Sequence, residues 1–175
     1  MIITLGGQMG SGKSTVAEIL AKQLHYKRYS MGELRRKMAL ARGMTLEEFN
    51  KLGEKESFTD KDVDEYQKEL GEKEDDFIVD GRLSFFFIPL SFKVFLTVDP
   101  DVGAARLLGR PKKEEQYATV EEAKAALERR MKSDKKRYFM YYGVDCYDPK
   151  QFDLAIDTTH LAPERVAKEI LDRLP

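Results

Sequence analysis

The sequence predicts a three-layer α/β domain, in which a parallel sheet lies between two layers of helices. Three observations indicate this fold class. Short apolar segments alternate with helical ones, a glycine-rich segment joins the first apolar segment to the first helix, and the later apolar segments end at or near an aspartate. Strands that are buried on both faces are continuously apolar, and helices connect them. With 175 residues and 42% hydrophobic content, one domain spanning 1–175 is expected.

The strands are expected where short apolar runs occur, at 2–5, 27–29, 77–79, 94–98 and 154–156. Helices are expected over 13–24, 33–42, 45–52, 60–70, 100–108, 120–142 and 163–174. Thr45 with Glu48, and Thr119 with Glu122, have the spacing of capping boxes at helix starts. Gly43 is typical of a helix C-terminus. The apolar run 85–90 is expected to lie in the buried core.

Charge and cysteine content narrow the class of protein. Thirty basic residues and thirty-one acidic residues leave a net charge of -1, which favours neither nucleic acid nor an anionic membrane as a partner. The single Cys146 excludes an internal disulfide and is consistent with a reducing cytosol. The apolar start at 1–5 has no basic leader and runs directly into glycines. We therefore expect a cytoplasmic protein that binds small molecules.

A phosphate-binding loop is predicted directly after the first strand. The segment 7–14, Gly-Gln-Met-Gly-Ser-Gly-Lys-Ser, has the spacing of a Walker A motif and lies between a strand and a helix, as that motif requires. Its backbone amides and the helix N-terminus would surround phosphate oxygens, and Lys13 would reach the β- and γ-phosphates. The ATP-binding residues predicted here are Gly7, Gln8, Met9, Gly10, Ser11, Gly12, Lys13, Ser14 and Thr15.

A magnesium site is predicted beside this loop. The hydroxyl of Ser14 is the expected protein ligand of Mg²⁺, a cation that prefers oxygen donors and keeps several waters. Asp80 follows the apolar run 77–79, so it is expected at the carboxyl end of a strand, where open α/β sheets bind ligands. Asp80 would hold the ion through water. The alternative for Asp80 is a structural cap of a turn or helix.

Arginines beyond the loop would neutralise the charge that spreads over a transferring phosphoryl group. Arg130, Asp134 and Arg137 lie at i, i+4 and i+7, so they share one stripe of a helix. A ligand clamp and a surface salt-bridge ladder both fit this stripe. The polar stretch 109–118 is interpreted either as a lid or as an exposed loop. The candidate arginines are Arg35, Arg36, Arg82, Arg106, Arg110, Arg129, Arg130 and Arg137, of which Arg106 and Arg110 are predicted to bind ATP.

The whole set of motifs resembles the cytidylate kinases, most closely their short archaeal-type branch. The similarity covers nearly the whole chain and includes the segment from Ser30 to Arg35, the strand end at 80–82, the stripe from Arg130 to Arg137, and the segments 142–145 and 156–159. This resemblance implies transfer of the γ-phosphoryl group of ATP to CMP or dCMP. It also implies a P-loop core of five parallel strands with a helical acceptor-binding insertion and a lid.

The resemblance also implies a division of the chain and roles for its residues. The core would comprise 1–30, 76–108 and 150–175, the acceptor-binding insertion about 31–75, and the lid with its following helix about 109–142. No covalent enzyme intermediate is expected. The catalytic residues would be Lys13, Arg82, Arg130 and Arg137, and the acceptor would contact Ser30, Arg35, Asp64, Gly81, Arg82, Arg130, Asp134 and Arg137.

Two departures from the bacterial relatives concern the acceptor base. Leu83 stands where those relatives carry an aspartate, and no arginine lies between Gly43 and Gly81. Polar contacts would then come from the insertion, through Asp60, Asp64 and Gln67, unless these residues only form a charged helix surface. Lys13 is also a departure, because many archaeal-type members carry threonine there.

Other functions remain open. Adenylate, shikimate or dephospho-coenzyme A kinase activity would use the same chemistry, and a non-catalytic ATP-binding module is the alternative from another class. The segment 50–53, Asn-Lys-Leu-Gly, lacks the aspartate with which a GTPase recognises guanine. The expected ligands are ATP, Mg²⁺ and a nucleoside monophosphate, and a monomer is expected.

Overall fold

The computed structural model describes residues 1–109 and 117–175. These residues form a five-stranded sheet in the order β2-β3-β1-β4-β5, in which all neighbouring strands are parallel. The strands are β1 (Ile2–Gly7), β2 (Lys27–Ser30), β3 (Phe77–Asp80), β4 (Phe92–Thr97) and β5 (Leu154–Asp157). Leu5 and Ser30 both pair with Asp80, so the carboxyl ends of β1, β2 and β3 meet at one edge of the sheet.

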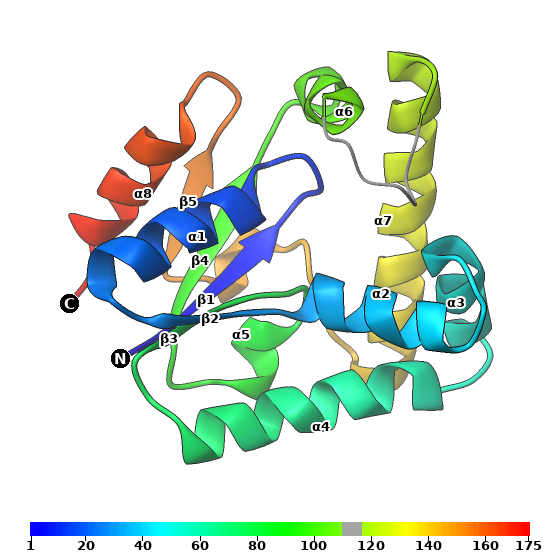
Figure 1. Cartoon of the computed structure of the whole chain (residues 1–175), viewed down its shortest axis with the longest axis horizontal. Helices are drawn as coiled ribbons and strands as arrows, with labels where there is room; N and C mark the ends of the chain where they lie inside the picture. Colours follow the sequence, from blue (N-terminus) through cyan, green and yellow to red (C-terminus); the bar gives the residue numbers. More distant parts are fainter. Residues whose placement is uncertain (110–116) are drawn as a thin grey trace.

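Helices cover both faces of the sheet, as the alternating pattern predicts (Figure 1). On one face α1 (Lys13–Leu24) packs beside α8 (Pro163–Leu171). The other face is covered by the short α5 (Ser84–Phe87) and by 144–147. Beyond the sheet, α3 (Leu46–Gly53) lies beside α7 (Val120–Tyr142) (Figure 1). The remaining elements are α2 (Met31–Ala41), α4 (Phe58–Lys73), α6 (Pro100–Leu108) and the 3-10 helix η1 (Pro149–Gln151).

The core follows the alternation of side chains along β1. Ile3 and Leu5 are fully buried and pack with Leu20 of α1 and Ile170 of α8. Thr4 points to the opposite face, where its hydroxyl lies 3.0 Å from that of Ser91. Because successive side chains of a strand alternate between faces, one strand contributes to both layers of the core.

The structure confirms the fold class and each predicted strand, with ends that shift by one or two residues. The helices at 100–108 and 120–142 have the predicted bounds. The capping box of α3 is present, because Glu48 N donates to Thr45 Oγ1 (3.2 Å) and Thr45 N donates to Glu48 Oε2 (2.8 Å). Helix α2 begins earlier than predicted, at Met31, because Ser30 caps it.

The apolar run 85–90 differs from the predicted buried core. It contains α5, a helix that the sequence pattern did not indicate, and only part of it is buried. Phe85, Phe87 and Ile88 lie in the core, whereas Phe86 is 40% and Leu90 is 96% exposed. A one-turn helix can bury only one side of a continuous apolar run, so the rest faces outward.

Two further predictions concern residues that the structure does not describe. Arg110 and most of the predicted lid at 109–118 lie outside the described residues.

Among the helices of the described residues, none combines the length and apolar character that a membrane crossing requires.

Candidate active site

The glycine-rich loop between β1 and α1 has a backbone that only glycine tolerates at two points. Gly7 has φ of 122°, and a Cβ there would lie 2.1 Å from the Leu96 carbonyl oxygen. Gly10 has φ of 79°, and a Cβ there would lie 2.5 Å from the backbone of Gly103. Both positions therefore combine a left-handed backbone with close contact to neighbouring main chain. The loop curls at the N-terminus of α1, where unpaired amides attract phosphate.

Lys13, the first residue of α1, folds back over this loop. Its ammonium group donates hydrogen bonds to the carbonyl oxygens of Gly7 (2.8 Å) and Gln8 and approaches the Ser11 hydroxyl at 3.4 Å. Burial, together with the nearby charges of Arg82 and Arg130, lowers the pKa of Lys13. A polyanion bound against the loop would oppose this shift, because negative charge favours the ammonium form.

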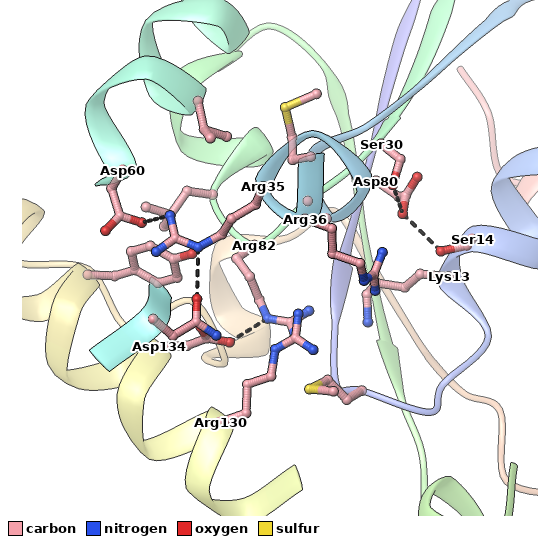
Figure 2. A pocket seen from close by; sticks show the side chains of 18 of the residues that line it. Lys13, Ser14, Ser30, Arg35, Arg36, Asp60, Asp80, Arg82, Arg130 and Asp134 are labelled. Atoms are coloured by element: carbon pink, nitrogen blue, oxygen red, sulfur yellow. Dashed lines mark hydrogen bonds and ion pairs between the residues drawn. The ribbon is translucent and has the colours of Figure 1, made fainter. Parts of the chain in front are cut away.

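Asp80 lies at the carboxyl end of β3 and gathers several hydrogen bonds (Figure 2). Its Oδ2 accepts from the hydroxyls of Ser14 and Ser30, each at 3.1 Å, and its Oδ1 accepts from Arg28 Nη2 at 3.2 Å. Ser14 and Asp80, the two predicted Mg²⁺ ligands, therefore lie within hydrogen-bonding distance of each other. The contact of Arg28 with Asp80 was not predicted. It depends on the pairing of β2 with β3, which no residues neighbouring Arg28 in the sequence indicate.

A single pocket extends from this loop into the helical part of the molecule (Figure 2). Lys13, Ser14 and Asp80 lie at one end, and Arg35 with Asp60 lies toward the other. Between these ends the pocket is lined by guanidinium groups from three elements, namely Arg36 of α2, Arg82 after β3 and Arg130 of α7. This concentration of positive charge beside a phosphate-binding loop suits a second phosphorylated ligand.

Asp134 holds the guanidinium groups of Arg82 and Arg137 in place. It is 2% exposed and accepts hydrogen bonds from Arg82 Nε (2.7 Å), Arg137 Nη2 (2.6 Å) and the Tyr147 hydroxyl (3.0 Å). Burial opposes ionisation of Asp134, but the charges of Arg82, Arg137 and Arg130 outweigh it and lower its pKa. The carboxylate is therefore ionised across the neutral range and can orient the guanidinium groups.

A second buried network lies at the end of the pocket away from the glycine-rich loop. Asp60 accepts from Arg35 Nη1 at 2.8 Å and also from Arg137 Nη1, while Arg35 Nε donates to Asn50 Oδ1 at 2.8 Å. Arg137 is completely buried and does not line the pocket. Asp60 and Asp134 therefore flank Arg137, which links α4 to α7.

Arg106 of α6 supports the loop from behind. Its guanidinium group donates to the carbonyl oxygens of Gly10 (3.3 Å), Thr158 (2.7 Å) and Thr159 (3.2 Å). In this way Arg106 joins the phosphate-binding loop to the segment after β5. It does not line the pocket.

The structure brings most of the predicted site residues to one place. The predicted residues that line the pocket are Met9, Gly10, Gly12, Lys13, Ser14, Ser30, Arg35, Asp64, Asp80, Gly81, Arg82, Arg130 and Asp134. Those that lie outside its lining are Gly7, Gln8, Ser11, Thr15, Arg106 and Arg137. Ser84 and Tyr147, which hold site residues in position, were not predicted, since an isolated serine or tyrosine carries no sequence signal.

Magnesium is compatible with the donors at the loop. Within residues 1–109 and 117–175, no group of three or more His, Cys, Asp or Glu side chains could hold a metal ion. A metal that needs a full protein ligand set therefore has no candidate site in that part of the chain. Mg²⁺ bound with phosphates keeps several waters and needs only one or two protein oxygens, and Ser14 Oγ with Asp80 Oδ2 supplies such a pair.

The parallel sheet, the glycine-rich loop, Lys13 and the adjacent Ser14–Asp80 pair define a P-loop phosphotransferase. The chain belongs to the cytidylate kinase-like family, whose model matches residues 2–160. It is 35% identical over 174 residues to a cytidylate kinase of Methanobrevibacter smithii, covering 99% of this chain and 98% of that protein. It is also 37% identical to a cytidylate kinase of Archaeoglobus fulgidus, covering 98% of this chain and 93% of that protein.

Solved structures of other small-molecule kinases share the fold. The shikimate kinase of Aquifex aeolicus superposes with a TM-score of 0.58 and 26% sequence identity, and the match covers 98% of this chain and 94% of that one. The α/β architecture with a five-stranded parallel sheet is thus common to kinases with different acceptors. Substrate choice must therefore depend on the residues that line the acceptor end of the pocket.

Proposed function

We propose that this protein transfers the γ-phosphoryl group of ATP to the 5′-phosphate of CMP or dCMP. One observation carries the proposal: a single pocket joins the phosphate-binding loop to a cluster of arginines and to a polar far end. Two phosphorylated substrates bound at the two ends would meet at the arginines. The membership of the cytidylate kinase-like family supports cytidine as the nucleoside of the acceptor.

The donor would bind at the loop. The amides at the start of α1 and the Lys13 ammonium would hold the β- and γ-phosphates, and Lys13 would exchange its bonds with loop carbonyls for phosphate oxygens. Ser14, and Asp80 through water, would hold Mg²⁺, which neutralises phosphate charge when bound. Asp80 is kept in position by Ser30 and Arg28, so its carboxylate needs no large movement.

The acceptor phosphate would bind between Arg82 and Arg130. Both guanidinium groups line the pocket, and Asp134 fixes Arg82 through a 2.7 Å hydrogen bond. Positively charged groups that are already in place stabilise developing negative charge without reorganisation. An oxygen of the acceptor phosphate would attack the γ-phosphorus in line with the departing ADP oxygen, so no covalent enzyme intermediate forms.

Arg137 is assigned a positioning role in this proposal. Because Asp60 and Asp134 both bind it, Arg137 would keep the acceptor helices α2 and α4 in register with the arginines of α7. Its predicted direct contact with a ligand would require a rearrangement of this buried network. Arg35 would reach the acceptor from the same network, since it lines the pocket.

The test is a panel of acceptors with the purified protein, ATP and Mg²⁺, in which release of ADP is followed. CMP, dCMP, UMP, AMP, GMP and shikimate are compared at equal concentration. Selective turnover with CMP or dCMP supports the proposal. Turnover with shikimate or AMP instead would retain the mechanism and refute the acceptor, and ADP release that no acceptor stimulates would refute the kinase function.

A cytoplasmic location and a monomeric state complete the proposal.

A further inference from the structure

A buried polar cluster lies beside the pocket, one helical turn along α4 from Asp60. It consists of Asp64 and Gln67 on α4, Ser84 on α5 and Tyr142 on α7. Asp64 is 5%, Gln67 2% and Ser84 0% exposed. Phosphoryl transfer as derived above uses none of these side chains. Buried polar groups that lack such a task usually have a structural or recognition role.

Hydrogen bonds fix the orientation of the Gln67 amide group. The Ser84 hydroxyl donates to Gln67 Oε1 at 2.6 Å, so the amide nitrogen of Gln67 turns toward Asp64 and lies 3.4 Å from its Oδ1. The Tyr142 hydroxyl donates to Asp64 Oδ2. The opposite orientation of the Gln67 amide would place its oxygen against the carboxylate, which is unfavourable.

Unused hydrogen-bonding capacity remains on the two residues that line the pocket. A carboxylate offers about four acceptor positions, and an amide nitrogen offers two donors. Asp64 and Gln67 both belong to the pocket lining, beside the apolar side chains of Met31, Val63 and Leu83. The end of the pocket therefore presents an acceptor and a donor side by side, next to apolar surface of the kind that packs against a flat ring.

We propose that Asp64 and Gln67 recognise the amino edge of cytosine and thereby select CMP over UMP. This inference rests on the proposed function. The Asp64 carboxylate accepts from the exocyclic amino group, and the Gln67 amide donates to the adjacent ring nitrogen. Uracil presents a carbonyl and an N–H at the same two places, so both contacts become repulsive or unsatisfied. Leu83, which also lines the pocket, then contributes only apolar contact.

Protonation of Asp64 would reverse its part in this recognition, because a protonated carboxyl donates and thus suits a carbonyl. Burial and the nearby Asp60 charge raise the pKa of Asp64 to about 7, against the opposing effects of the Tyr142 hydrogen bond, Arg35 and Lys68. These groups face Asp64 from α4, α2 and α7. The preference for CMP should therefore weaken as the pH falls below about 7.

The decisive experiment compares kcat/KM for CMP and UMP in wild type and in Asp64→Asn, at about pH 8 and about pH 6. The ratio of the two constants cancels effects on ATP, Mg²⁺ and the acceptor phosphate, which the two nucleotides share. We expect Asp64→Asn to lower the CMP:UMP ratio by about 10- to 100-fold at pH 8, the effect of one mispaired buried group. The wild-type ratio should fall at pH 6, whereas the variant's ratio should not.

One control variant and one further test variant separate the possible outcomes. Asp62→Asn makes the same chemical change at an exposed position of α4 and should leave the ratio unchanged. Gln67→Met removes the donor at similar length and should reduce kcat/KM for CMP more than for UMP.

An unchanged ratio in Asp64→Asn, or a wild-type preference for UMP, would overturn the inference. Wild-type use of CMP together with an unchanged ratio would reject only base recognition by Asp64. Failure of every acceptor with the wild type would reject the proposed function itself.

Discussion

Replacing Asp134 by asparagine should destabilise the protein strongly, although the side chain keeps its size. Asp134 is 2% exposed and accepts from Arg82 at 2.7 Å and from Arg137 at 2.6 Å. Arg137 would keep Asp60 as a partner, but the Arg82 guanidinium would lose its carboxylate in a buried site. Removing one partner of a buried ion pair costs about 3–5 kcal/mol, because the remaining charge is uncompensated.

Urea unfolding at neutral pH measures this cost. With an m-value of about 2 kcal/mol/M, a loss of about 4 kcal/mol lowers the unfolding midpoint by about 2 M. Asp172→Asn is the matched control, since Asp172 pairs with Lys168 at 2.8 Å on the surface, where both side chains are more than half exposed. A surface pair contributes about 0–1 kcal/mol.

The pH dependence gives an independent check on Asp134. Its pKa is lowered in the folded state, so its stabilising effect is present above the unfolded pKa of about 3.9 and is lost as the pH falls below it. The difference between wild type and Asp134→Asn should be constant from about pH 6 to 8 and should shrink below about pH 4. A loss of stability no larger than that of Asp172→Asn would refute this account of the network.

Three further predictions concern the loop, the acceptor pocket and a helix cap. Lys13→Ala should reduce kcat by about 10²–10³-fold or more while the far-ultraviolet circular dichroism is retained, and near-normal turnover would contradict the role of the loop. Asp64→Asn should raise the free energy of unfolding at pH 8 by up to about 4 kcal/mol, because the folded state disfavours the ionised carboxyl, and this gain should shrink as the pH falls from about 7 toward 4. Thr45→Ala should cost about 1 kcal/mol through loss of the α3 capping box, measured by thermal unfolding.

The parts of the fold that were predictable depend on local signals. Helix α7 begins after Thr119, whose hydroxyl accepts from Glu122 N, and it ends before Gly143, which has φ of 67°. Caps of this kind depend on a few neighbouring residues, so the first and last residues of α7 could be predicted. The glycine loop is equally local. Helix α5 was missed because a single turn, made of one serine and three phenylalanines, gives no helical periodicity.

The sequence indicated which residues belong to the candidate site, but it did not indicate how they are arranged. The spacing of Arg130, Asp134 and Arg137 places them on one stripe of α7, yet the pocket receives Arg130 and Asp134 while Arg137 is buried against Asp60. Asp60 and Arg137 are 77 residues apart in the chain. Periodicity gives the face of a helix, but only the packing of α3 and α4 against α7 decides what covers it.

In the proposed reaction, the γ-phosphoryl group passes from ATP to the acceptor nucleotide. The most direct measurement is a single-turnover reaction of the protein with ATP labelled at the γ-phosphate, Mg²⁺ and CMP, with separation of the products. The label is expected in CDP, in an amount equal to that of the ADP formed. Label found as inorganic phosphate, or retained in ATP while the protein binds both nucleotides, would contradict the proposed reaction.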